Sequence, residues 1–392
     1  MRWFRTARFI FLLSISSAIS GGGQAQPQST TGQEPPTLAD IARQYQAKKQ
    51  SKGPSQAEIN RLSEGLNNAA EKQDDLRREG VSATSSSDED IYQAQIKGLL
   101  AKRGFDQLDQ AAQAARSSKA RFAGGVWQLY SFYEALRTPT TPRAATQADW
   151  AAHLAVLKEW LATRPESITA PVALADAYIS YAWKARGGGF ADTVREDGWR
   201  LMGDRVEMAK ELLVKARSLK TRCPYWYEAM QHVALLEGWD KSAARALFDE
   251  AVSFEPHFYH YYREHVNFLL PKWYGEDGDA EEFANEVAAR VDGQEGAFFY
   301  FELASVINCQ CGSDEVHMAR MSWPKIKQGY GALKQLYGTT SLKENRYAYM
   351  AYLAKDRPVA HDEFVKIGAN WLPTVWKTRN AFETARLWAM SQ

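Results

Sequence analysis

The sequence has few cysteines, almost no net charge and no long apolar run after its N-terminus. Three cysteines among 392 residues are too few for disulfides to hold such a chain together. Basic residues number 48 and acidic residues 47, which excludes a whole-chain field that would attract nucleic acid or acidic lipid. No later stretch approaches about 18 consecutive apolar residues, so the sequence predicts no transmembrane segment after the N-terminal region.

Recognisable catalytic motifs are also missing. The chain has no GxSxG, no HExxH and no glycine-rich nucleotide fingerprint, and no Ser/His/Asp or Cys/His arrangement stands out. It lacks the basic and aromatic stripe that is typical of nucleic-acid binding. The sequence therefore favours a protein that is not an enzyme.

The N-terminus has the pattern of a signal peptide. Three arginines within the first eight residues precede a short apolar run at 9–19, and Gly23 and Ala25 are small residues suited to a cleavage site. We therefore predict a signal peptide over 1–25 and an exported protein, periplasmic or secreted and bacterial. An uncleaved membrane anchor is the alternative.

Residues 26–90 are rich in polar residues and read as a flexible linker with one or two amphipathic helices. Ser55 and Glu58 form a capping box that opens one such helix, and a run of serines and acids near residue 85 has too little apolar surface to pack. This segment is either a spacer or a docking element for a protein partner.

Residues 91–392 consist of one amphipathic helical pattern after another, joined by short turns. Ala244, Phe248, Ala251 and Pro256 have the spacing of the second helix in a helical-hairpin repeat. Alternating strand patterns are hard to find. The predicted helices include 226–236 and 326–336, and 375–390 reads as a single closing helix. The predicted fold is all-α, with stacked helical hairpins forming an α-solenoid, since a single hairpin of this kind cannot bury its own apolar face.

One hairpin, within 165–216, contains a long interruption. Its helices carry large and small residues in register, and a glycine-rich charged segment at 184–204 separates them. Long loops inside tight repeats often carry function.

The hairpin spacings resemble divergent tetratricopeptide repeats over most of 92–370. Three segments, at 121–136, 177–199 and 255–279, are similar to a family of exported bacterial proteins classed only as a domain of unknown function: RFAGGVWQLYSFYEAL, AYISYAWKARGGGFADTVREDGW and EPHFYHYYREHVNFLLPKWYGEDGD. This second resemblance, over about 92–305, supports the fold and implies no activity, substrate or catalytic residue.

Ligand-binding candidates cluster around the interruption and in one later turn. Three glycines after Arg186 permit close approach of a ligand, and aromatic residues with polar neighbours can hold a sugar or a peptide. The alternatives are that the charged residues cap helices and pair with one another, and that the aromatics only shield a turn. The candidates are Asp176, Trp183, Lys184, Arg186, Asp192, Thr193, Arg195, Trp199, Trp273 and Tyr274.

A metal site is a second hypothesis. His257, His260 and Glu264 follow one another at helical spacing and could hold zinc with an open coordination position. Buried or hydrogen-bonded histidines are the alternative interpretation. Cys223, Cys309 and Cys311 are interpreted as free thiols or a disulfide, with metal binding left as a further alternative.

Together these patterns predict an exported helical-repeat protein that binds a protein, a peptide or a cell-envelope ligand without catalysis. The alternative is a metal-binding protein or hydrolase centred on the three candidate metal ligands.

Overall fold

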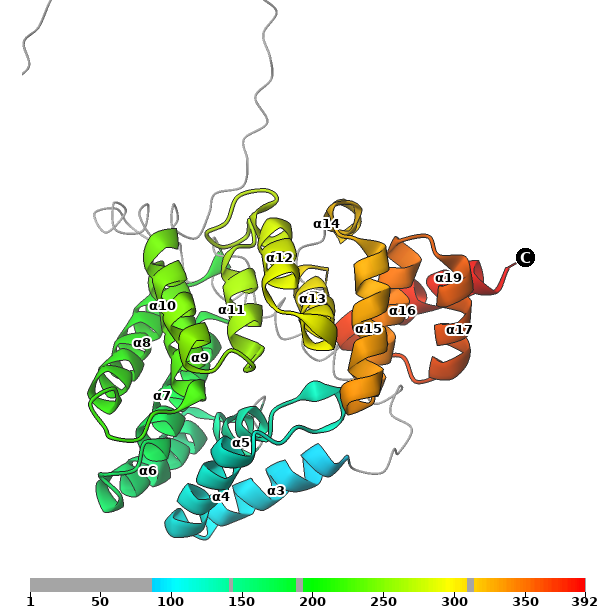
Figure 1. Cartoon of the computed structure of the whole chain (residues 1–392). Helices are drawn as coiled ribbons and strands as arrows, with labels where there is room; N and C mark the ends of the chain where they lie inside the picture. Colours follow the sequence, from blue (N-terminus) through cyan, green and yellow to red (C-terminus); the bar gives the residue numbers. More distant parts are fainter. Residues whose placement is uncertain (1–86, 141–143, 188–192, 309–313, 392) are drawn as a thin grey trace, which may run out of the picture. The chain divides into compact units, whose positions relative to one another are not determined.

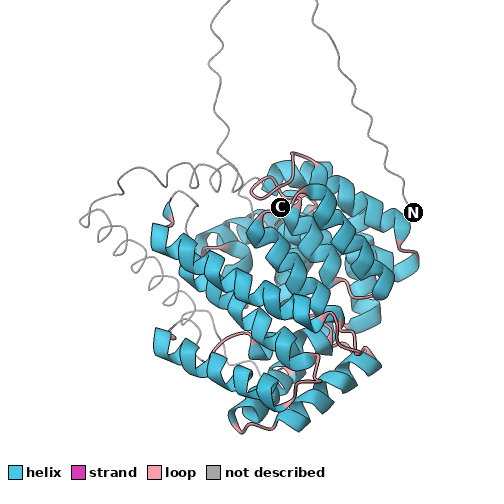
Figure 2. Ribbon diagram, turned by 90° about the vertical axis from the view of Figure 1, so that its left-hand side faces the viewer, coloured by secondary structure: helices cyan, strands magenta, loops and turns pink. Residues whose placement is uncertain are grey.

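A computed structural model of the chain describes residues 87–140, 144–187, 193–308 and 314–391. Over these ranges all regular elements are helices, and the one β-type contact is an isolated bridge between Arg121 and Trp127 (Figures 1 and 2). The predicted all-α fold is confirmed. None of these helices combines the length and hydropathy needed to span a bilayer. The predicted signal peptide and most of the predicted linker lie outside the described residues.

The helices follow one another with short connections. In chain order they are α3 (Asp88–Ala101), α4 (Phe105–Ser118), the 3-10 turn η1 (Ala123–Gly125), α5 (Gln128–Leu136), α6 (Gln147–Thr163), α7 (Thr169–Arg186), α8 (Glu196–Ala216), α9 (Pro224–Glu237), α10 (Lys241–Phe254), α11 (His260–Phe268), α12 (Asp279–Arg290), α13 (Gly293–Ile307), α14 (Asp314–Arg320), α15 (Trp323–Tyr337), α16 (Ser341–Leu353), α17 (Arg357–Ile367), α18 (Pro373–Trp376) and α19 (Arg379–Met390).

The helices pack as successive hairpins. The closest pairs include α7 with α8, α9 with α10, α13 with α15, and α16 with α17. The helices α3, α5, α7, α9, α11 and α13, which we call the first helices, also pack on one another in that order. The predicted second-helix residues Ala244, Phe248 and Ala251 are all buried, as expected for positions where two helices approach closely.

The interruption in the α7–α8 hairpin is shorter than the sequence suggested. Helix α7 ends at Arg186, and α8 begins at Glu196, well before the predicted end of the interruption at residue 204. Acidic residues in the first turn favour a helix N-terminus, and Arg200 pairs with Asp204 on the exposed face of α8 at 3.3 Å. The charged residues from Glu196 to Asp204 therefore belong to an amphipathic helix and not to a loop.

The C-terminal segment also differs from the prediction of a single closing helix over 375–390. Lys377 has a φ of 62°, which ends α18 after one turn, and the Thr378 side chain accepts a hydrogen bond from the Ala381 N–H to cap α19. A side chain that caps the second helix stabilises the break between the two.

The turn between α4 and α5 connects distant parts of the chain. Gly124 and Gly125 have φ values of 75° and 79°, and a Cβ atom on Gly125 would lie 2.7 Å from the Phe298 ring of α13. Arg121 pairs with Glu295 of α13 at 3.0 Å. This turn therefore lies against α13 and α15 (Figure 1), and only a glycine permits so close an approach at a positive φ.

Candidate functional site

Charged side chains from successive first helices, and from α16, face one another inside the stack. We call this set the polar recess; its members are Glu134, Arg137, Asp176, Glu228, His232, Arg263, Glu264, Glu302 and Lys343. Their side chains range from fully buried at Glu302 to 27% exposed at Glu134. Charged residues are rarely so buried unless they are paired.

Arg137, the C-cap residue of α5, interacts with several polar groups at one end of the recess. Its guanidinium donates to Asp176 of α7 at 3.1 Å and to the Tyr225 hydroxyl of α9 at 2.6 Å, and it also pairs with Glu134. Tyr225 in turn donates to Asp176 at 2.9 Å. Burial alone would lower the pKa of Arg137, but Asp176 and Glu134 keep that pKa well above its usual value. Arg137 is therefore a permanent cation shared by two carboxylates.

At the other end of the recess, Glu302 of α13 is the shared partner of two cations. It accepts from Arg263 of α11 at 2.7 Å and from Lys343 of α16. Burial would raise the pKa of Glu302, but the two cations outweigh burial and lower it. Burial also lowers the pKa of Lys343 to about 8, although Glu302 opposes that shift. One fully buried carboxylate thus balances two cations.

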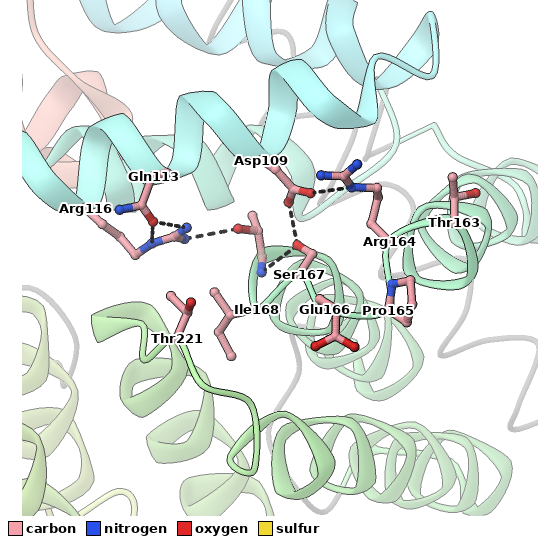
Figure 3. A pocket seen from close by; sticks show the side chains of 11 residues that line it. Asp109, Gln113, Arg116, Thr163, Arg164, Pro165, Glu166, Ser167, Ile168 and Thr221 are labelled. Atoms are coloured by element: carbon pink, nitrogen blue, oxygen red, sulfur yellow. Dashed lines mark hydrogen bonds and ion pairs between the residues drawn. The ribbon is translucent and has the colours of Figure 1, made fainter.

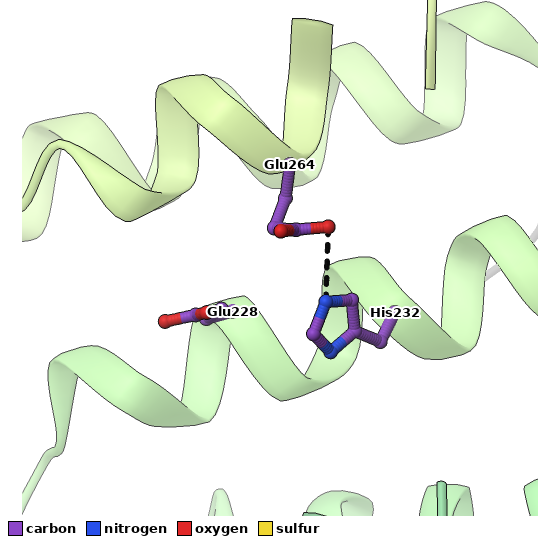
Figure 4. A group of neighbouring side chains, drawn as sticks. All are labelled: Glu228, His232 and Glu264. Atoms are coloured by element: carbon purple, nitrogen blue, oxygen red, sulfur yellow. Dashed lines mark ion pairs between the residues drawn. The ribbon is translucent and has the colours of Figure 1, made fainter. Parts of the chain in front are cut away.

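The middle of the recess holds two carboxylates and an imidazole. Glu228 and His232 lie one turn apart on α9, and Glu264 faces them from α11 (Figure 4). The His232 Nε2 atom lies 2.9 Å from a Glu264 oxygen, and one potential ligand atom from each of the three residues lies within 4.8 Å of the others. Glu228 is 1% exposed, and its Oε2 atom has no hydrogen-bond partner.

The protonation of this central group follows from burial and from charge. Burial, reinforced by the nearby charge of Glu264, raises the pKa of Glu228 well above its usual value. Burial would lower the pKa of His232, but Glu264 outweighs burial and raises it. Burial would raise the pKa of Glu264, yet His232 and Arg263 lower it. Glu264 is therefore the charged partner of His232, whereas Glu228 favours its neutral form.

This assignment predicts that Glu228→Gln stabilises the protein near neutral pH. A carboxyl whose pKa is raised by folding adds stability below its unfolded pKa, and that contribution is lost as the pH rises toward the folded value. Glutamine is neutral throughout. We therefore expect the variant to have a higher free energy of unfolding than the wild type at pH 8, measured by urea denaturation with EDTA present.

The same comparison at lower pH is the control. The difference in unfolding free energy between the variant and the wild-type protein should shrink toward zero near pH 5, where glutamate in the unfolded chain begins to take up its proton. A variant that is less stable than the wild type at pH 8 would show that Glu228 is stabilising as a carboxylate.

The structure brings together residues from two regions that the sequence singled out separately. Trp183 at the end of α7 and Trp273 in the turn after α11 meet edge to face, with ring centroids 5.7 Å apart. Arg186 lies against Trp183 and Trp199, with its guanidinium carbon 5.6 and 5.5 Å from their rings. Tyr274 packs against the same small apolar cluster as Trp183 and Trp273. We call Trp183, Arg186, Trp199, Trp273 and Tyr274 the aromatic cluster.

The other ligand-binding candidates are placed differently. Asp176 lies in the polar recess, as described above. Lys184 and Thr193 are exposed, and Arg195 is exposed and pairs with Asp197 at 3.1 Å. Asp192 lies outside the described residues. The exposed candidates therefore do not converge with Asp176.

The three predicted metal ligands do not form one group. His257 is exposed and its imidazole pairs with Glu295 at 2.6 Å. His260 is buried and stacks on Tyr130 at a centroid distance of 3.7 Å; burial, reinforced by Arg263, lowers the pKa of His260 well below its usual value. Glu264 points to His232 instead. Among the described residues, the cluster suited to a metal is Glu228, His232 and Glu264.

Sequence reasoning missed most of the recess, although a signal was present. Glu228 and His232 interrupt an otherwise apolar helix, PYWYEAMQHVALLE, and Glu302 stands alone within FFYFELASVI. A charged residue inside an apolar helical run that is buried all round must find a partner in the interior. Cys223 is a buried free thiol near the Tyr133 hydroxyl, and Cys309 and Cys311 lie outside the described residues.

A separate surface pocket of about 470 Å³ lies between α4, the turn before α7 and the loop before α9 (Figure 3). Its polar side chains bond mainly to one another: Asp109 accepts from Arg164 and Ser167, and Arg116 donates to Gln113 and Thr169. These bonds connect neighbouring hairpins, so the polar wall of this pocket has a structural role.

No protein-family model, curated protein or solved structure matches the chain. The similarity to tetratricopeptide repeats stays a prediction, and the geometry alone supports the functional proposals.

Proposed function

We propose that this protein is a non-catalytic binding module that holds a peptide segment of a partner protein along the polar recess and the aromatic cluster. The observation that carries the proposal is that Arg137, Arg263 and Glu264 are largely surrounded by protein and yet remain partly exposed. Each side chain is 22–24% exposed, yet burial is the largest influence on its pKa. Charged groups that protein surrounds but solvent still reaches are available for contact with a ligand, and a few polar groups of this kind are typical of binding sites.

The recess leads toward the aromatic cluster along the first helices. Asp176 and Trp183 are seven residues apart on α7, and Glu264 and Phe268 are four residues apart on α11. Both spacings keep side chains on one face of a helix. Leu235 of α9 and Phe268 form the small apolar cluster against which Trp183 and Trp273 pack. Polar and aromatic surfaces are thus adjacent along the same helices.

A peptide matches these two surfaces. Its backbone and charged side chains can bond to the carboxylates and guanidinium groups of the recess, which carry both signs, and an apolar side chain can pack on the half-buried tryptophans. In keeping with the signal peptide that the sequence predicts, we propose a partner outside the cytoplasm. A cell-envelope polymer is the competing ligand class and is an outcome of the test below.

Replacing Trp183 tests the proposal. Peptides selected on the wild-type protein from a random phage-displayed library should bind Trp183→Ala at least about 10-fold more weakly, because truncating a central aromatic anchor costs about 1–2 kcal/mol or more. Isothermal titration calorimetry with the selected synthetic peptide, in EDTA, measures the change.

Trp388→Ala is the matched control. Trp388 is also a half-buried tryptophan beside an arginine, with the Arg357 guanidinium carbon 5.2 Å from its ring, but it lies on α19. Its replacement should leave peptide affinity unchanged. Failure to select any peptide, together with binding of muropeptide or glycan fragments that Trp183→Ala abolishes, would replace the peptide with a cell-envelope polymer.

A further inference from the structure

The polar recess carries more acids than arginines and lysines. Its carboxylates are Glu134, Asp176, Glu228, Glu264 and Glu302, and its basic side chains other than histidine are Arg137, Arg263 and Lys343. Each of these basic side chains forms its ion pair with a carboxylate other than Glu228 and Glu264. With all acids ionised, the two carboxylates of the central group are therefore the ones without an arginine or lysine in an ion pair.

The geometry of the central group suits a cation of charge two. We infer that Glu228, His232 and Glu264 form a binding site for a divalent transition-metal ion, with Zn²⁺ as the preferred ion. The inference goes beyond peptide binding and does not depend on it. The arrangement and the chemistry of the three side chains carry the inference.

The distances allow coordination with small movements. Ligand atoms around tetrahedral zinc lie about 3.3 Å apart, given metal–ligand distances of about 2.0–2.1 Å. The three potential ligand atoms already lie within 4.8 Å of one another, and the His232–Glu264 pair lies at 2.9 Å. A zinc ion between them would replace the hydrogen bond of that pair. The Glu228 carboxylate, whose Oε2 has no hydrogen-bond partner, could rotate to become the third ligand of the ion.

The type of ligand narrows the choice of metal. Two carboxylates and one imidazole favour zinc or manganese over magnesium and calcium, which prefer oxygen ligands alone. Zinc binds nitrogen and oxygen ligands more tightly than manganese does. His232 and Glu264 are 16% and 24% exposed, so water can reach the ion and occupy the remaining coordination positions, as in zinc sites with three protein ligands.

Metal titration of the full chain tests the inference without any peptide. After EDTA treatment and dialysis, we expect about one Zn²⁺ per chain by isothermal titration calorimetry and elemental analysis. Glu228→Gln should bind Zn²⁺ at least about 10-fold more weakly, and His232→Ala should lose the site. Circular dichroism of Glu228→Gln establishes that the variant is folded, so that weaker metal binding by it is not the result of unfolding.

His257→Ala is the matched control, since His257 also pairs with a glutamate but is exposed and outside the group. Its zinc affinity should equal that of the wild type. Co²⁺ should give visible d–d bands without a thiolate charge-transfer band. The inference is overturned if neither Zn²⁺ nor Mn²⁺ binds stoichiometrically, if Glu228→Gln binds as the wild type does, or if cysteine substitution removes the metal. None of these results bears on peptide binding, which is measured in EDTA.

Discussion

Glu302→Gln should destabilise the protein by about 3–5 kcal/mol, the range found when one partner of a buried ion pair is removed. The change keeps the size of the side chain but removes the charge that Arg263 and Lys343 share. Lys343, whose pKa is already lowered to about 8, can respond by losing its proton. Arg263 cannot. Urea denaturation followed by circular dichroism measures the loss.

Glu286→Gln is the control, because it removes a glutamate that is also in an ion pair but is exposed. Glu286 pairs with Arg245 at 2.6 Å, but its side chain is 40% exposed. Exposed ion pairs contribute about 0–1 kcal/mol, so this variant should stay close to the wild type. Equal losses for the two variants would mean that burial of Glu302 has no special energetic role and that the recess is more hydrated than its exposure indicates.

Gly329→Ala should force apart the helices α13 and α15. A Cβ atom at this position would lie 2.2 Å from the Ala297 carbonyl oxygen and 2.8 Å from the Phe301 Cβ. Both atoms belong to α13, so α13 and α15 must move apart. Overpacking typically costs about 1–3 kcal/mol, and we expect a net loss in this range even though alanine favours a helix by about 1 kcal/mol over glycine.

Gly331→Ala supplies the control on the same helix. No atom lies within 4 Å of a Cβ built at Gly331, so only helix propensity changes and the variant should gain up to about 1 kcal/mol. Opposite signs for the two substitutions in thermal or urea denaturation support the close approach of α13 and α15. A stabilised Gly329→Ala would contradict it.

The sequence determined the fold class and most helix positions because these depend on neighbouring residues. The spacing of Ala244, Phe248 and Ala251 specifies a helix that packs on the helix before it, and both partners lie within a few dozen residues. The same reasoning placed the limits of α9 and α15 within a few residues. It failed at α8 and α19, where exposed charges and a single left-handed residue decided the boundaries.

Only the tertiary structure decided which polar groups meet. His260 and Glu264 lie one turn apart on α11, yet His260 stacks on α5 whereas Glu264 pairs with His232 on α9. Spacing along one helix identifies a shared face, but it does not specify which neighbouring helix each side chain reaches. That choice depends on how the hairpins stack, and the stacking is fixed by contacts between residues far apart in the chain, such as those of Gly125 with Phe298.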